Sequence, residues 1–166
     1  MRSRAVILPI PGDPFLLRYW LSLFNRIWEP EIDRLYIHLN SSIEKPLVDY
    51  MRALCGKYPK IYWKYTPNQI DHGVAINKIL DEVQEKYIML IEDDGFIFRR
   101  GIVNRAFETL ESGQFDIVGS KRGSCGTEIL DAAQKKWGLD YTGLGDQGPN
   151  FWPCYFFCEK ALLLKT

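Results

Sequence analysis

The chain has 166 residues, of which 46% are hydrophobic and 14% are aromatic. This length and apolar content suit one domain with its own core, and they exclude a disordered chain. Lys and Arg together number 21, as do Asp and Glu, so overall charge gives no reason to expect nucleic acid or an anionic membrane as a partner.

The N-terminal segment carries no targeting signal that we recognise. The apolar run Ala5–Ile10 is short, and Pro-Gly-Asp-Pro follows it at 11–14. Such a run is too brief for a secretory signal or a transmembrane segment. The four cysteines form no Cys-x-x-Cys pair, which argues against structural zinc. We therefore expect a cytoplasmic protein with free thiols, with a redox pair as the alternative.

Strand-like and helix-like segments alternate along the chain. Short apolar runs predict strands, and apolar residues spaced three or four apart predict helices. In chain order, the prediction is strand Ala5–Pro9, helix Phe15–Trp28, strand Leu35–Leu39, helix Leu47–Leu54 closed by Gly56, strand Ile61–Tyr65, helix Val74–Val83, strand Tyr87–Ile91, helix Ile102–Leu110, strand Phe115–Gly119, helix Ile129–Trp137, loop Gly138–Pro153, and strand Tyr155–Phe157 leading into a helix near Glu159.

This alternation predicts the fold class. Strands that alternate with helices form βαβ units with right-handed crossovers. We therefore expect an α/β domain with three layers, α/β/α, around a mainly parallel central sheet. In such sheets ligands bind beyond the carboxyl ends of the strands. The chain contains neither Gly-x-Gly-x-x-Gly nor Gly-Lys-Ser/Thr, which disfavours dinucleotide-binding and P-loop functions.

An acidic triplet follows the fourth predicted strand. The apolar run Tyr87–Ile91 ends at Glu92, Asp93 and Asp94, and Gly95 comes next. Three neighbouring carboxylates repel one another unless a cation lies among them. A hard divalent ion with oxygen ligands is the natural candidate. The alternative is a polar turn in which Asp-Asp-Gly has only a conformational role.

Three stretches of the sequence resemble one enzyme family. They are Val6–Pro11, a strand ending in prolines; Gly73–Leu80, a helix of small residues with an Asn; and Tyr87–Phe98, a strand followed by an Asp-x-Asp-like motif. Together they resemble glycosyltransferase family 2, whose members have the Rossmann-like GT-A fold and use nucleotide-sugar donors. The resemblance implies an inverting transfer from a nucleoside-diphosphate sugar, by default a UDP-sugar, to a hydroxyl group of a glycan or another acceptor.

The resemblance also assigns roles to individual residues. Asp94 would be the direct ligand of Mn²⁺ or Mg²⁺, and Glu92 would assist either this role or that of Asp93. Asp93 would hold the ribose or a metal-bound water. Pro9 and Pro11 would contact the nucleotide base. These roles suit the chemistry, because a bound cation stabilises the negative charge that grows on a diphosphate leaving group.

Three positions carry open alternatives. The family usually has an Asp after the second strand, whereas this chain has Asn40; it is either a nucleotide contact or an Asx-turn residue. Asp71 is either a nucleotide contact, an N-cap of the following helix, or both. The family's usual acidic pair for the general base is missing near the C-terminus, and Asp146 is the best substitute. Its alternative is a turn residue in a Gly-rich loop.

The sequence thus predicts a single GT-A-like domain over residues 1–166, either whole or part of a longer polypeptide. The predicted function is metal-dependent glycosyl transfer. Two other functions stay open, a non-catalytic nucleotide- or glycan-binding module and a sugar nucleotidyltransferase. The latter would need a basic, Gly-rich loop after the first strand, and none follows Pro9. The aromatic residues Trp137, Trp152 and Tyr155 are candidate contacts for the acceptor.

Overall fold

A computed structural model describes residues 3–10, 14–28, 31–40, 45–93, 95, 97, 99–119 and 155–164. Several predicted features lie outside these residues: the helix Ile129–Trp137, the loop Gly138–Pro153 with Asp146, and the site candidates Pro11 and Asp94.

The described residues form one six-stranded sheet with the order β3-β2-β1-β4-β6-β5. Strands β1, β2, β3 and β4 run parallel to one another, whereas β6 lies antiparallel between β4 and β5. The predicted mainly parallel sheet is therefore confirmed. The strands are β1 (Arg4–Ile10), β2 (Arg34–Leu39), β3 (Ile61–Tyr65), β4 (Tyr87–Ile91), β5 (Ile117–Gly119) and β6 (Tyr155–Glu159).

The helices agree with the sequence except at their ends. They are α1 (Pro14–Leu23), the π-helix η1 (Phe24–Trp28), α2 (Lys45–Lys57), α3 (His72–Leu80), α4 (Ile102–Glu111) and α6 (Lys160–Leu163). Gly56 does not close α2, because the Tyr58 N–H still bonds the Leu54 carbonyl oxygen, beyond the glycine. Helix α3 ends before Val83, whose burial beside the sheet gave the longer apolar pattern.

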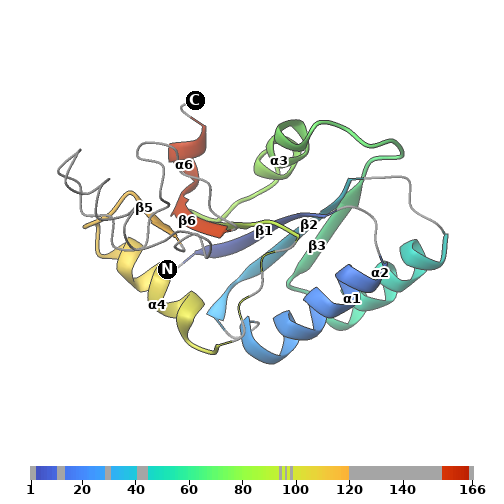
Figure 1. Cartoon of the computed structure of the whole chain (residues 1–166), viewed down its shortest axis with the longest axis horizontal. Helices are drawn as coiled ribbons and strands as arrows, with labels where there is room; N and C mark the ends of the chain where they lie inside the picture. Colours follow the sequence, from blue (N-terminus) through green and yellow to red (C-terminus); the bar gives the residue numbers. More distant parts are fainter. Residues whose placement is uncertain are drawn as a thin grey trace, which may run out of the picture.

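The helices cover both faces of the sheet, which makes the three predicted layers (Figure 1). Helices α1, α2 and α4 pack on one face and share a core cluster with Val6, Leu8 and Ile10 of β1. Helices α3 and α6 lie on the other face, where Ala5 and Ile7 point. Successive strand residues face opposite sides, so a central strand covered on both faces is apolar throughout. This explains why β1 is buried along its whole length.

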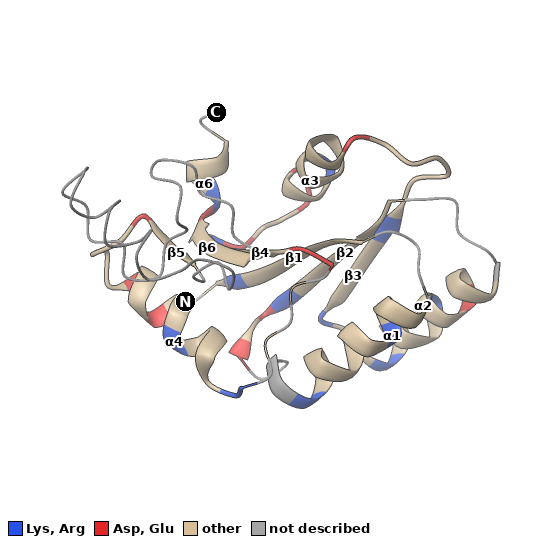
Figure 2. Ribbon diagram, viewed as in Figure 1, with Lys and Arg blue, Asp and Glu red and all other residues tan. Residues whose placement is uncertain are grey.

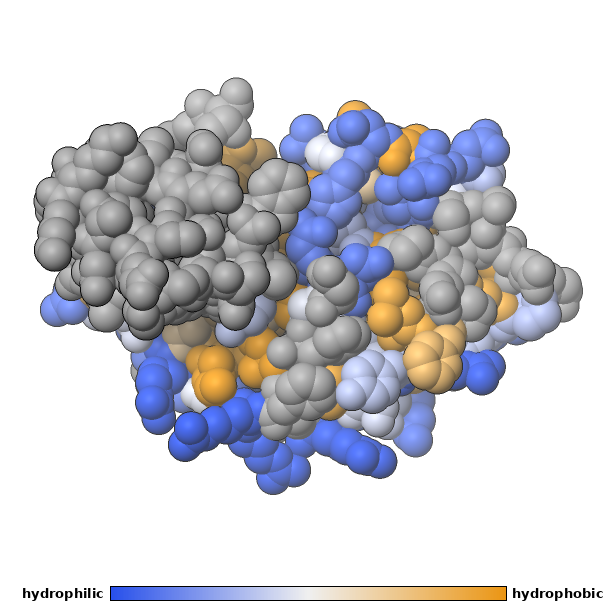
Figure 3. Space-filling model, in the orientation of Figure 1, coloured by the Kyte–Doolittle hydropathy of each residue, from blue (hydrophilic) through white to orange (hydrophobic). Residues whose placement is uncertain are grey.

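Some apolar surface remains exposed. An apolar area is visible over α1 in Figure 3, and Phe15 of that helix is 80% exposed. The surface over α3 is mostly hydrophilic in the same view. Among the described residues, no helix has both the length and the hydropathy needed to span a membrane.

Two of the four cysteines belong to the described part of the chain. Cys55 is half-buried and Cys158 is fully buried, and both are free thiols. Burial raises the pKa of Cys158 to about 12. A thiol that stays protonated is a poor nucleophile and a poor metal ligand, so Cys158 serves the core by packing.

Candidate functional site

A pocket of about 190 Å³ lies where the parallel strands end. Its walls come from the ends of β1, β2 and β4 and from the loop that precedes α3. Figure 2 shows acidic residues at the end of β4, near the middle of the sheet. The lining residues are Pro9, Ile10, Asn40, Gln69, Ile70, His72, Glu92 and Asp93.

The pocket opens at the point where the strand order reverses. From β1 the chain first builds outward through β2 and β3, and then returns to the other side of β1 with β4. Pairing of β1 with β4 ends at Ile7 and Leu90, while pairing with β2 continues to Ile10 and Leu39. Pro9 lies beyond the β4 ladder and has no N–H to donate. Such switch points are where open α/β sheets bind ligands.

Hydrogen bonds hold the described residues of the acidic turn after β4. The Gly95 N–H donates to the Glu92 carbonyl oxygen at 3.0 Å and closes the turn. The indole of Trp20, which is fully buried in α1, donates to the Gly95 carbonyl oxygen at 3.2 Å. The turn therefore holds Glu92 and Asp93, both half-buried, against one wall of the pocket.

His72 faces the acidic turn across the pocket. Its Nε2 lies 3.3 Å from Glu92 Oε1, and the two side chains are 50% and 39% exposed. The sequence alone did not predict the contact of His72 with Glu92, because the two residues are far apart in the chain and share no motif. The two residues meet because α3 begins, and β4 ends, at the same edge of the sheet.

Asn40 fastens the loop that precedes α3. Its Nδ2 donates to the Ile70 carbonyl oxygen at 2.9 Å, and its Oδ1 accepts from the Ile70 N–H at 3.0 Å. The side chain is buried, with 8% of the residue exposed. Asn40 therefore makes long-range loop contacts in place of an Asx turn, and it lines the pocket as well.

Asp71 caps helix α3. Its Oδ1 accepts from the N–H groups of Gly73 at 2.9 Å and Val74 at 3.3 Å. This is the N-cap geometry, in which a side-chain oxygen satisfies amides of the first helical turn. Asp71 is exposed and is not one of the residues that line the pocket.

The described oxygen ligands at the acidic turn are of the kind that a hard divalent cation prefers. Glu92 and Asp93 contribute carboxylate oxygens, which Mg²⁺ and Mn²⁺ prefer. Within the described ranges, no three His, Cys, Asp or Glu side chains gather closely enough to hold a metal ion. Two carboxylates suffice where substrate phosphates complete the coordination, as is common for Mg²⁺. Asp94, the ligand implied by the family resemblance, lies outside the described residues.

A further candidate lies beside the acidic turn. Tyr155 begins β6, pairs with Ile91 at the end of β4, and is half-buried. Of the three aromatic residues that we expect to contact the acceptor, Tyr155 is thus next to the acidic turn, whereas Trp137 and Trp152 lie outside the described residues.

Comparisons with known proteins agree with this architecture. The profile of the family described as glycosyl transferase family 2 matches residues 6–165. No curated protein matches the sequence. Among solved structures, the mannosyltransferase PcManGT from Pyrobaculum calidifontis, in complex with GDP-Man and Mn²⁺, is 16% identical and has a TM-score of 0.75. The match covers 99% of this chain and 47% of that one.

TarS from S. aureus, residues 1–349, is a second structural relative. Its complex with UDP-GlcNAc is 12% identical with a TM-score of 0.64, over 98% of this chain and 47% of that one. Another structure of TarS is 13% identical with a TM-score of 0.54, over 75% and 38%. The chain thus spans less than half the length of each of these three solved structures. The family profile covers nearly the whole chain, and the six-stranded, mainly parallel sheet agrees with the solved structures. The chain therefore belongs to glycosyl transferase family 2 and has the GT-A fold.

Proposed function

We propose that this chain binds the donor in a metal-dependent glycosyltransferase and transfers a sugar from a nucleoside diphosphate to a hydroxyl acceptor. The observation that carries the proposal is the pocket at the switch point. Its wall has carboxylates at one end, on the β4 turn, and only uncharged groups at the other, around Pro9, Asn40 and Ile70.

This division of charge orients the donor. A diphosphate is strongly anionic, so it approaches Glu92 and Asp93 only through a cation that both can share. The nucleoside is uncharged and fits the opposite end, beside Pro9 and Ile70. The proposal therefore places the diphosphate and cation near the acidic turn and the base near the ends of β1 and β2.

The reaction requires the bond between the sugar and the diphosphate to break. When a divalent cation is bound, it supplies Lewis-acid stabilisation of the leaving diphosphate. In an inverting transfer, the acceptor oxygen attacks the anomeric carbon and gives its proton to a general base. We keep Asp146 as the proposed base. Asp94 stays the proposed direct metal ligand.

The donor class rests on the family. PcManGT was solved with GDP-Man and TarS with UDP-GlcNAc, so this fold accepts both a purine and a pyrimidine diphosphate. We propose a UDP-sugar as the first donor to test, and a GDP-sugar as the second.

Donor hydrolysis tests the proposal and separates it from a binding module. Purified protein is incubated with UDP- and GDP-sugars, with Mn²⁺ or with a chelator, and the release of nucleoside diphosphate is measured. We expect Mn²⁺-dependent release, and a loss of about a hundredfold or more in Asp94→Asn. Asp81→Asn, which removes an exposed carboxylate at the end of α3, is the matched control and should keep full activity.

Two results would contradict this function. Nucleotide binding without any turnover, in the presence of candidate acceptors, would favour the non-catalytic module. Turnover that is equally fast with the chelator would contradict the metal dependence.

A further inference from the structure

The segment from Thr66 to Asp71 forms one side of the pocket and is fixed at both ends. At its start, the Thr66 N–H donates to the Leu39 carbonyl oxygen at 3.1 Å, which extends the pairing of β2 with β3. At its end, Asp71 is bound to the first turn of α3. Between these points, Ile70 is held through both of its main-chain groups by Asn40.

Asn40 uses both halves of its amide for this contact. Its oxygen accepts from the Ile70 N–H at 3.0 Å, and the Thr66 hydroxyl lies 3.4 Å from the same oxygen. The Thr66 hydroxyl also lies 3.5 Å from Nε2 of His38, which is buried. A nucleobase is distinguished by its pattern of donors and acceptors, and the Asn40 oxygen is already committed to the loop. The contacts of Asn40 thus indicate that it positions the Thr66–Asp71 segment.

Gln69 is the exposed polar side chain of this segment that lines the pocket. It directly precedes the residue that Asn40 fixes. Its amide offers a donor and an acceptor together. The neighbouring Ile70 contributes an apolar surface, and His72 lies at the cation end against Glu92. The Asn40 amide is hydrogen-bonded to Ile70, so at the uncharged end of the pocket Gln69 offers an amide to a ligand.

We propose that Thr66–Asp71 is the base-recognition segment of the pocket, in which Gln69 discriminates between nucleobases while Asn40 positions the segment. This inference rests on the proposed function, because it takes the ligand to be a nucleoside diphosphate. It departs from the direct nucleotide contact that the family resemblance implied for Asn40.

The test measures dissociation constants for UDP, GDP, CDP and TDP, and for inorganic pyrophosphate, all with Mn²⁺. Four proteins are compared: wild type, Gln69→Ala, Asn40→Asp and Gln114→Glu. The last is the matched control, because it makes the same change from amide to carboxylate at an exposed residue after α4, outside the pocket lining. Pyrophosphate has no base and reports on the cation end alone.

We expect Gln69→Ala to reduce the preference for the best nucleotide over the next by about fivefold or more. Asn40→Asp places a carboxylate against the Ile70 carbonyl oxygen, so it should weaken the binding of all four nucleotides by about tenfold. Neither change should alter pyrophosphate binding, and Gln114→Glu should resemble wild type. Circular dichroism establishes that each variant is folded. Gln69 is exposed, so its variant tests the inference even if Asn40→Asp unfolds.

The outcomes separate the two proposals. An unchanged order and spacing of nucleotide affinities in Gln69→Ala would overturn this inference, as would a folded Asn40→Asp that binds nucleotides like wild type. A wild-type protein that binds no nucleotide would overturn the proposed function itself, and this inference with it.

Discussion

The indole Nε1 of Trp20 donates to the carbonyl oxygen of Gly95 at 3.2 Å, across 75 residues of sequence. Trp20 is in the middle of α1 and is fully buried, while Gly95 closes the acidic turn by donating to the Glu92 carbonyl oxygen. The packing of α1 on the sheet therefore sets the position of the carboxylates in the pocket. The core and the proposed cation site are coupled through one hydrogen bond.

We predict that Trp20→Phe weakens both stability and cation binding. Phenylalanine keeps most of the apolar contact but leaves the Gly95 carbonyl oxygen without its donor, at a cost of about 1–3 kcal/mol. Urea denaturation measures the stability, and Mn²⁺ titration in the presence of UDP or GDP measures the second effect. A variant with wild-type stability and Mn²⁺ affinity would show that the hydrogen bond does not hold the turn.

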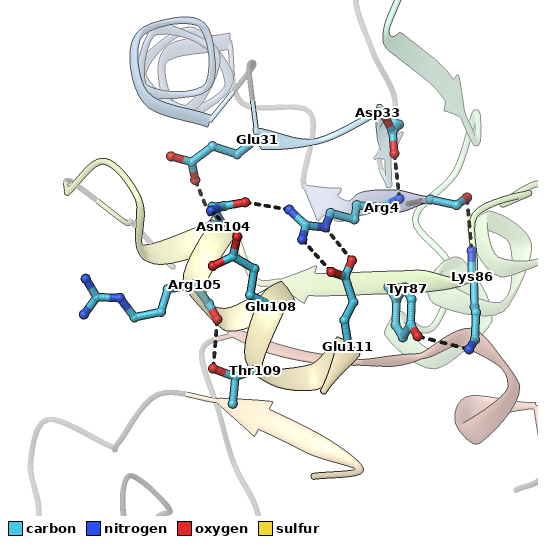
Figure 4. A network of polar contacts seen from close by, with 11 residues as sticks. Arg4, Glu31, Asp33, Lys86, Tyr87, Asn104, Arg105, Glu108, Thr109 and Glu111 are labelled. Atoms are coloured by element: carbon cyan, nitrogen blue, oxygen red, sulfur yellow. Dashed lines mark hydrogen bonds and ion pairs between the residues drawn. The ribbon is translucent and has the colours of Figure 1, made fainter. Parts of the chain in front are cut away.

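A buried ion pair links β1 to α4. The Arg4 guanidinium lies amid polar groups of α4 (Figure 4), donating to Glu111 at 2.7 and 2.8 Å and to Asn104 Oδ1 at 2.7 Å. The hydrogen bonds to Glu111 raise the pKa of Arg4. Because the Arg4 side chain is only 6% exposed, Glu111→Gln leaves a buried charge without its counter-ion. We predict a loss of about 3 kcal/mol in unfolding free energy.

The matched control for Glu111→Gln is Asp49→Asn. Asp49 pairs with Arg52 on the surface of α2, where the side chains are 49% and 72% exposed. Surface pairs of this kind contribute little, so the loss should stay below about 1 kcal/mol. Equal losses in the two variants, by urea denaturation, would contradict the special role of the buried pair.

Glu31 caps helix α4 from a distant part of the chain. Its carboxylate accepts from the N–H groups of Gly101 at 2.7 Å and Asn104 at 3.0 Å. Gly101 itself, at the N-cap position, has no side chain to do this. We predict that Glu31→Ala lowers the unfolding free energy by about 1 kcal/mol. Thermal unfolding at neutral pH checks this, and an unchanged midpoint would contradict the capping role.

The order of elements was readable from the sequence because local patterns determine it. The apolar run of β1 follows from burial on both faces, and the spacing of Leu17, Trp20, Leu21 and Phe24 follows from one buried helical face. The predicted helix ends were less accurate, since helix ends depend on tertiary contacts. Gly56 remains inside α2, and the first turn of α4 is capped by Glu31, which is distant in the chain.

The site was predicted only where its residues form a local motif. Glu92 and Asp93 follow a buried strand, so their place at a strand end was predictable. His72, Gln69 and Ile70 join the pocket through the sheet topology, which brings distant loops to one edge. The engagement of Asn40 with Ile70 was equally invisible, since 30 residues separate the two. The spacing of residues along the sequence does not predict such long-range contacts.

His38 predicts a dependence of stability on pH. Burial, and then the positive charges of Lys78 and Lys64, hold its pKa below the ordinary value of 6.5. The unfolded chain therefore binds a proton at higher pH than the folded protein does. The stability from this group is fully present above pH 6.5, and it is lost as the pH falls through the lower pKa of the folded state.

The measurement compares wild type and His38→Gln by urea denaturation between pH 7.5 and pH 5. The variant should lose less stability on acidification than wild type. A His38→Gln curve parallel to that of wild type would contradict the prediction.

The most direct test of a donor site at the acidic turn is thermal unfolding with UDP, GDP, CDP and TDP, each with and without Mn²⁺, for wild type and Asp94→Ala. A ligand at a hundred times its dissociation constant stabilises a protein by about 2.7 kcal/mol. For a domain of this size that raises the midpoint by roughly 5–10 °C. We predict such a rise with at least one nucleotide, dependent on Mn²⁺ and absent in Asp94→Ala. No rise with any nucleotide, or an equal rise in the variant, would contradict a donor site at the acidic turn.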